Sequence, residues 1–181
     1  MNKILTNEFY NQPTINAAQR LIGKQFHFFG TDAIITETEA YIQDGDESCH
    51  ASRGKTLRNA TMFDDGGVSY VYLIYGMYHC INFVTESEGY GAAVLIRALK
   101  IDGVDYKETN GPGKLCRFLD ITRKHNGLSL ASADLHVKDI DLELPYETTE
   151  RIGISKSKGL PWRFVVKKEN LPPFAPIAKE V

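Results

Sequence analysis

The sequence lacks the features that mark secreted, membrane-spanning and disulfide-stapled proteins. Of its 181 residues only three are cysteines. Cys49, Cys80 and Cys116 are scattered and odd in number, which is typical of free thiols in a reducing compartment. No apolar run is long enough to cross a bilayer, and the N-terminal MNKILTNEFYNQP does not resemble a signal peptide. We therefore expect a cytoplasmic protein with no membrane partner.

The chain also has little excess charge of either sign. Its 21 basic and 23 acidic side chains give a formal net charge of −2. This argues against a strongly basic protein that coats nucleic acid through its whole surface. Local basic clusters remain, and one loop carries Arg53, Lys55 and Arg58. For any single cluster a solvated surface is the ordinary explanation. A polyanion bound through such a cluster would be held with modest, salt-sensitive affinity.

No internal repeat or Pro/Ser-rich linker divides the chain, so residues 1–181 are expected to form a single domain. Thr14 is expected to cap a helix that Gly23 ends, and 110–121 to form a glycine-rich turn and short helix. Strands follow one another with few helices between them, which predicts an α+β fold with a mainly antiparallel sheet. The expected strands are QFHFFG (25–30), DAIITETEAYI (32–42), GVSYVYLIY (67–75), HCINFVT (79–85), AAVLIRALKI (92–101), DLHVKDIDLEL (134–144) and LPWRFVVKK (160–168).

Glu37, Glu39 and Tyr41 alternate along the expected strand 32–42. Alternate residues of a strand point to one face, so both carboxylates are expected on the side of Ile35, where the strand leaves the core for a cleft. A partly buried carboxylate there can act as a general base. An exposed edge strand with solvated carboxylates explains the pattern equally well, and periodicity does not choose between the two glutamates.

Arg97 interrupts the otherwise apolar run from Ala92 to Leu99. A buried arginine needs a carboxylate partner, and a glutamate of strand 32–42 is the obvious one. Two interpretations remain open: a purely structural ion pair, or a pair that holds a water molecule. Asn82, in the neighbouring strand, is also an uncommon residue for a strand interior.

Tyrosines are concentrated in the segment YVYLIYGMY (70–78). Aromatic packing in the sheet core accounts for Tyr70. Tyr75 lies at the tip of an expected hairpin, where a core role is hard to arrange. An exposed aromatic side chain there suits stacking on nucleobases or insertion between base steps, which makes nucleic acid a candidate partner.

Two adjacent pairs, Cys49-His50 and His79-Cys80, raise the question of zinc. Metal ligands close in sequence are usually separated by two to four residues, and neighbours on a strand project to opposite faces. We therefore expect no metal and no cofactor. Cys80 is better explained as a small buried residue, and His50 as a structural or hydrogen-bonding histidine.

Five segments together resemble a known family. TETEAYIQDGDESCHASRG, RNATMF, VYLIYGMYHCIN, AAVLIRAL and NGPGKLC stand in the order and approximate spacing of the alkyladenine (3-methyladenine) DNA glycosylases, the single-domain family that includes the human enzyme. The resemblance covers roughly residues 14–170, and the length is similar to that of a bacterial member. It implies a compact domain with a curved, mainly antiparallel sheet, flanking helices and a protruding β-hairpin.

The resemblance also implies catalytic roles. Glu39, not Glu37, matches the glutamate that activates water, and Glu37 is left as a structural or supporting charge. Arg97 matches the arginine that helps to position that water. A main-chain carbonyl near Ile152 is implied as a further contact.

Further roles implied by the resemblance concern DNA. Tyr75 matches the tyrosine that intercalates where a nucleotide has been flipped out. Asn82 matches the asparagine that discriminates against guanine at the pocket edge. The walls of the base pocket correspond to Tyr41, His50 and Tyr72. The residues expected to contact the DNA backbone are Arg53, Lys55 and Arg58.

The implied activity is that of a monomeric DNA-repair enzyme, nucleoid-associated when bound. It acts on double-stranded DNA containing damaged purines such as 3-methyladenine or hypoxanthine. One carboxylate suffices where sugar hydrolases usually need two, because an alkylated purine is already cationic and leaves readily. No lyase step is expected. Two alternatives stay open: a non-catalytic nucleic-acid-binding module with Tyr75 as a wedge, and a small-molecule hydrolase.

Two segments depart from the family pattern. Leu57 stands where proline is common, and the turn Glu86–Gly91 is longer and more acidic than expected beside the pocket strands. The two acidic side chains of this turn either weaken contacts with the DNA backbone or lie away from DNA.

Overall fold

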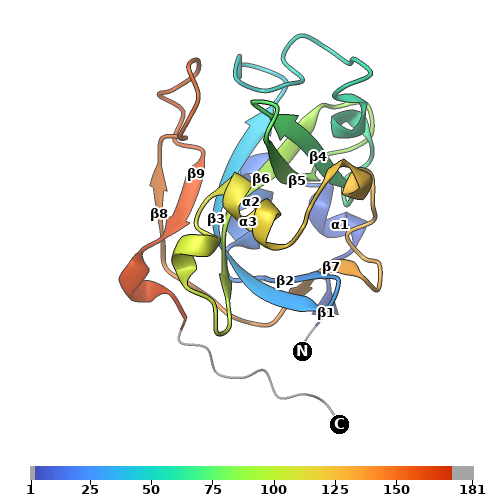
Figure 1. Cartoon of the computed structure of the whole chain (residues 1–181). Helices are drawn as coiled ribbons and strands as arrows, with labels where there is room; N and C mark the ends of the chain where they lie inside the picture. The colour runs from blue at the N-terminus through green and yellow to red at the C-terminus, as the bar shows by residue number, and fades with distance from the viewer. Residues whose placement is uncertain (1–2, 173–181) are drawn as a thin grey trace.

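The strands of the computed structural model, which describes residues 3–172, form one antiparallel sheet (Figure 1). Along the sheet they lie in the order β1-β7-β2-β3-β6-β5-β4, and β8 and β9 pair with each other beside β3. This curved sheet with few helices confirms the predicted α+β fold. The strands are Lys3–Ile4 (β1), Gln25–Phe28 (β2), Thr31–Ile42 (β3), Ser69–Ile74 (β4), Tyr78–Val84 (β5), Ala92–Ile101 (β6), Leu135–Asp139 (β7), Tyr146–Thr149 (β8) and Arg163–Val166 (β9).

Helices are short and lie against the sheet. The α-helices are Asn7–Tyr10 (α1), Thr14–Leu21 (α2) and Pro112–Phe118 (α3), and the 3₁₀ turns are Ala60–Phe63 (η1), Tyr106–Glu108 (η2), Arg123–His125 (η3) and Lys168–Asn170 (η4). Among residues 3–172 no helix has the length and apolar character needed to cross a bilayer.

β3 is the central strand of the sheet. Its first half pairs with β2 and β6, and its second half with β9 and β6. The register with β6 shifts at Glu37, which pairs with Ala98 before Thr38 pairs with Ile96, so Arg97 is left without a Cα partner on β3. Bulges of this kind bend strands and re-aim side chains. The irregularity therefore falls where the two carboxylates and the arginine meet.

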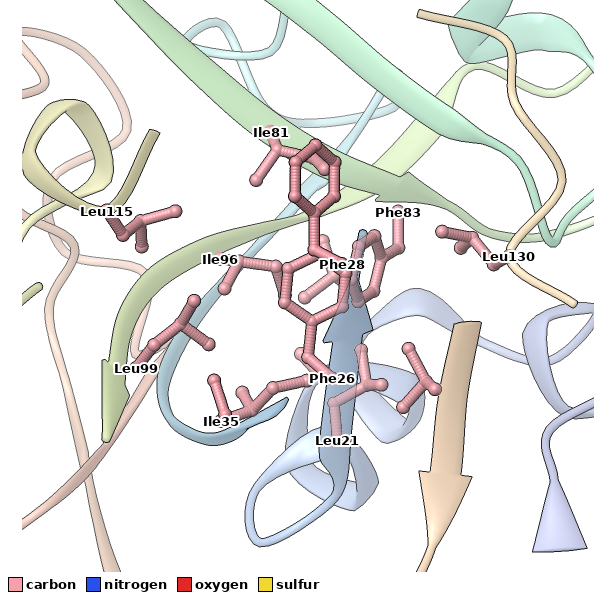
Figure 2. Packing of buried hydrophobic residues seen from close by; sticks show 14 of the residues in the cluster. Leu21, Phe26, Phe28, Ile35, Ile81, Phe83, Ile96, Leu99, Leu115 and Leu130 are labelled. Carbon is pink, nitrogen blue, oxygen red and sulfur yellow. The ribbon is translucent and has the colours of Figure 1, made fainter. Parts of the chain in front are cut away.

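The main core fills the space between the sheet and the helices. Figure 2 shows Phe26 and Phe28 of β2 among Ile81 and Phe83 of β5 and aliphatic side chains from other elements. A smaller cluster beside it includes Cys49, Met62 and Tyr70. All three cysteines are free, as predicted, and all are buried, which was predicted for Cys80 alone.

Thr14 does not cap α2, which corrects the prediction. It is the first helical residue, after Pro13. Its backbone N–H and its hydroxyl both donate to Glu86 Oε1, at 2.8 and 2.9 Å. A carboxylate is favourable at a helix N-terminus, where free N–H groups carry partial positive charge. The capping residue, Glu86, is 72 residues further along the chain, so the local sequence around Thr14 does not reveal it.

Glu86 belongs to the acidic turn Glu86–Gly91, so part of the turn's charge has a structural use. Its own N–H donates to the Tyr10 carbonyl, and its φ of 67° is unusual for a residue with a side chain. The turn is thereby fixed to both α1 and α2.

The last third of the chain differs from the predicted strands. The expected strand 134–144 ends as β7 at Asp139. Asp139 Oδ1 accepts the N–H of Asp141, whose φ is 55°. A side chain that bonds its own backbone two residues on favours a turn. The four-residue β8 that follows was not predicted.

We expect Glu86→Ala to lower the free energy of unfolding by about 0.5–2 kcal/mol, the usual value of a lost N-cap. Urea unfolding measures this change. Glu88→Ala, which removes an exposed carboxylate from the same turn, is the control and should change stability little. Equal stability of the two variants would contradict the capping role.

Candidate active site

Glu37 and Glu39 face the same side of β3, as predicted, because both contact Arg97. Glu37 Oε1 accepts from Arg97 Nε at 2.9 Å and from Arg163 Nε at 2.7 Å. The Arg163 side chain extends further to the Thr149 hydroxyl. Glu37 is therefore an ionic link between β3, β6 and β9, which fits the structural role expected of it.

Glu39 is fully buried, and donors from several segments surround its carboxylate. Oε1 accepts the backbone N–H of Ile152 at 2.8 Å, and Oε2 accepts the Tyr41 hydroxyl at 2.7 Å. Arg97 Nη1 lies 3.4 Å from Oε2. The loop after β8 thus reaches Glu39 through the Ile152 N–H. The main-chain carbonyl near Ile152 that the resemblance implies as a contact for the water stays a prediction.

Burial raises the pKa of Glu39 from its ordinary value. Arg97 and the two hydrogen bonds from Ile152 and Tyr41 oppose this increase in pKa, and the nearby Glu37 adds to it. A carboxylate with a raised pKa accepts a proton more readily than an ordinary one, which is the property required of a general base.

A cavity of about 580 Å³ opens beside these groups. The three residues predicted as pocket walls, Tyr41, His50 and Tyr72, line it, and so does Asn82, which was predicted at the pocket edge. Tyr75 and Arg97 line it as well. The structure thus brings six of the predicted site residues around one cleft, and Glu39 lies directly behind Tyr41 and Arg97. The roles assigned to them stay predictions.

Aromatic side chains form one wall of the cleft. His50 Nδ1 and the Tyr70 hydroxyl are hydrogen-bonded at 3.0 Å, and the His50 ring packs edge-on against Tyr72 with centroids 4.5 Å apart. Tyr70 is buried, as predicted. Burial, and then the nearby Arg58, lower the pKa of His50, which favours the neutral form of the ring. Asn59 fixes the His50 backbone by donating to its carbonyl at 2.8 Å.

Asn82 has a fixed orientation at the cleft. Its Nδ2 donates to the Tyr70 carbonyl at 3.0 Å, and the residue is buried on β5. The side-chain amide therefore cannot rotate without losing a buried hydrogen bond.

The β4–β5 hairpin presents Tyr75 at its tip. Tyr75 and Gly76 have φ of 53° and 68°, and the N–H of Met77 donates to the Ile74 carbonyl across the turn. Positive φ at both central residues is what a type I′ turn requires. Tyr75 is 78% exposed and Met77 69%. The tip is therefore apolar and accessible, as predicted for Tyr75.

The basic loop predicted to contact DNA is exposed beside this hairpin. Arg53, Lys55 and Arg58 are all exposed, and Arg58 Nη2 lies 3.4 Å from the Leu73 carbonyl of β4. Leu57, which stands in place of the family's proline, is fully exposed.

Two residues that no sequence pattern singled out, Asp46 and Arg151, form a buried ion pair near Glu39. Their side chains are fully buried and form a bidentate salt bridge, with Arg151 Nη1 2.6 Å from Asp46 Oδ2 and Nη2 2.7 Å from Oδ1. Arg151 immediately precedes Ile152, whose N–H binds Glu39. The two partners are 105 residues apart, and no local pattern links them.

Metal ligation has no support among residues 3–172, where no group of three or more His, Cys, Asp or Glu side chains could hold an ion. His50 and Cys49 belong instead to the cleft wall and to the small core cluster.

Comparison with known proteins identifies relatives along nearly the whole chain. A family model described as methylpurine-DNA glycosylase matches residues 8–170. A curated protein of Rickettsia felis is 51% identical over 169 residues, covering 92% of this chain and 96% of that protein. One of Wolbachia sp. subsp. Brugia malayi is 49% identical over 166 residues, covering 91% and 98%. Both carry the provisional name 3-methyladenine DNA glycosylase.

We expect Glu39→Gln to make the fold at least as stable as wild type near neutral pH. Because the folded pKa of Glu39 lies above its unfolded value, ionisation costs stability as pH rises through the unfolded value of about 4.3. Glutamine avoids that cost, so its advantage should vanish below about pH 4. Urea unfolding at both pH values measures it, and lower stability of the variant at neutral pH would contradict it.

The same change at Glu37 is the matched comparison. Glu37→Gln leaves Arg97 and Arg163 without their shared charge partner, so it should lower stability near neutral pH.

Proposed function

The chain belongs to the methylpurine-DNA glycosylase family, and we propose that Glu39 is the residue with which it removes damaged purines from double-stranded DNA. It is a DNA glycosylase, an enzyme of base excision repair that hydrolyses the N-glycosidic bond between base and deoxyribose. One observation carries the assignment of Glu39: a fully buried carboxylate, held by a main-chain N–H and a tyrosine hydroxyl, behind the wall of an aromatic cleft.

The target bond becomes accessible when the damaged nucleotide leaves the duplex. Base flipping costs a few kcal/mol, less for damaged or mispaired bases. In the proposal Tyr75 enters the gap in the stack and the extruded purine enters the cleft beside Tyr41 and Tyr72. The exposed turn and the 580 Å³ cavity support both placements. Arg53, Lys55 and Arg58 then bind backbone phosphates of the flanking duplex, and one copy of the chain suffices.

Hydrolysis needs one proton transfer to the protein. Water attacks the anomeric carbon, its proton passes to Glu39, and the bond to the purine breaks with its electron pair going to the base. Arg97 is 3.4 Å from Glu39 Oε2 but 2.9 Å from Glu37 Oε1. Charge-assisted hydrogen bonds are usually about 2.7–2.9 Å long. Arg97 is therefore held chiefly by Glu37, and its Nη1 can orient the water.

The proposed substrates are purines that carry positive charge, 3-methyladenine first among them. Such a base leaves as a neutral molecule and needs no acid. Hypoxanthine is neutral and needs a proton, and the lowered pKa of His50 makes that side chain a poor source at pH 7. Aromatic walls also favour cationic rings over neutral ones. We therefore propose weaker activity on hypoxanthine.

The proposed reaction stops at the abasic site. A lyase step needs an amine that forms a Schiff base, typically a lysine desolvated in an apolar pocket. Lys156 lines the cleft, but its Nζ pairs with Glu47 at 2.9 Å and its side chain is half exposed. This arrangement supports a monofunctional enzyme.

We expect Glu39→Gln to abolish release of 3-methyladenine from a duplex oligonucleotide, because the amide cannot accept the proton of water. Its affinity for the same oligonucleotide should fall only modestly, since the side chain keeps its shape. Single-turnover excision and fluorescence anisotropy measure the two quantities. Glu88→Gln, an exposed carboxylate outside the cleft, is the control. If the wild type binds but releases no base, the chain acts as a binding module instead.

We expect Tyr75→Ser to reduce excision from duplex DNA about 10-fold or more, because stacking contributes roughly 1–3 kcal/mol per base. Release from a single-stranded oligonucleotide should change much less, since no stack has to be opened. Tyr146→Ser is the matched control, an exposed tyrosine on β8 that packs on Phe164. Equal losses on both substrates would exclude the wedge role.

A further inference from the structure

Glu39 depends on groups from segments far apart in the chain, and the buried Asp46–Arg151 pair lies where those segments meet. Arg151 joins three of them. Nη1 donates to the Ala40 carbonyl of β3 at 2.9 Å, the two Nη atoms bind Asp46, and Nη2 reaches the Ser157 carbonyl at 3.4 Å. The side chain thereby connects β3, the loop after β3 and the loop after β8.

Two of the three hydrogen-bond donors on Glu39 are linked to Arg151, one through the chain and one through the guanidinium. Ile152 follows Arg151 in the chain and donates its N–H to Glu39 Oε1. Tyr41 donates its hydroxyl to Oε2, and the Arg151 Cζ lies 4.5 Å from the centroid of the Tyr41 ring. Tyr41 also lines the cleft, whereas the Arg151 side chain is fully buried, so the guanidinium holds the ring from the protein side.

Resting on the function proposed above, we propose that Asp46 and Arg151 are positioning residues that hold Ile152 and Tyr41 on the Glu39 carboxylate. Neither touches the reacting atoms. A planar guanidinium that binds a carboxylate through two parallel hydrogen bonds is held in one orientation. Neither a lysine in place of the arginine nor a neutral partner in place of the carboxylate would fix the orientation in this way. The backbone of Ile152 is fixed by this grip, one residue away.

Joining the two loops does not by itself explain why the Asp46–Arg151 pair is fully buried. The same two loops are also joined by the Glu47–Lys156 pair, whose side chains are 72% and 51% exposed. Exposed pairs contribute little to stability, because solvent screens them. A fully buried pair costs more desolvation than a hydrophobic replacement would, which points to a gain in geometry.

Loss of the pair should alter the acid–base behaviour of Glu39. The Ile152 N–H and the Tyr41 hydroxyl both lower the pKa of Glu39, so weakening them raises it further. A general base works in its ionised form, so the acidic limb of the rate profile should move to higher pH. The other titratable or charged groups around Glu39 are Glu37 on β3, Arg97 on β6, Cys80 on β5 and Arg151 itself.

The test compares Asp46→Asn with Asp139→Asn, in single-turnover excision of 3-methyladenine across a range of pH. Asp139 pairs with Lys24 at 2.7 Å on the β7 side of the sheet, so the control makes the same chemical change away from the cleft. We expect Asp46→Asn to reduce the rate about 10- to 100-fold, the cost of misplacing a reacting group by about 1 Å, and to move the acidic limb upward. Asp139→Asn should leave both unchanged.

A double variant, Asp46→Asn with Arg151→Met, guards against a folding defect. It leaves no unpaired buried charge, so it should fold even where the single variant does not. The same slow rate and shifted limb are expected. If a folded variant has the excision rate of the wild type and the same acidic limb in its pH profile, the positioning role is overturned and the proposed function is left intact. Failure of the wild type itself to release any base would overturn the proposed function, and the positioning role with it.

Discussion

A carboxylate removed from water has to be stabilised by donors that the protein supplies, and Glu39 is the clearest case in this fold. Burying such a group without partners costs several kcal/mol. The donors are an arginine on the neighbouring strand, a tyrosine two residues along the same strand, and an amide more than a hundred residues further on. The sheet order, the bulge at Glu37 and the course of the last third of the chain all bring these donors together.

The charges behind the cleft form two separate arrangements. Glu37 is held between Arg97 and Arg163, and Asp46 is held by Arg151. Each arrangement joins strands or loops that are not consecutive in the chain. Mutual satisfaction of buried charges rigidifies such regions, because a partly satisfied network is costly. The cleft therefore has one wall of aromatic rings and two separate ion-pair clusters near Glu39.

Local sequence patterns predicted those features of the structure that depend on residues close together in the chain. Alternation along residues 32–42 predicted that Glu37 and Glu39 share a face, and a glycine in a short connection predicted the exposed hairpin tip. Partners distant in sequence were beyond that reasoning. Glu86 as the cap of α2, and Arg151 as the partner of Asp46, are set by the folded chain alone. Periodicity also could not distinguish Glu37 from Glu39. The difference is that Glu37 is bound by two arginines, Arg97 and Arg163, which come from other strands.

The conformation of the hairpin tip has a consequence for how the protein would search DNA. Tyr75 is already fixed at a positive φ by a two-residue turn that a backbone hydrogen bond closes. If the ring enters a stack as proposed, little backbone entropy is lost, because the turn is already formed in the folded chain. With a net charge of only −2, the chain as a whole has little long-range attraction to phosphate, so we expect encounters to be brief. A probe that is rigid before contact suits such a search, since each short visit can sample a base step without first waiting for a loop to order.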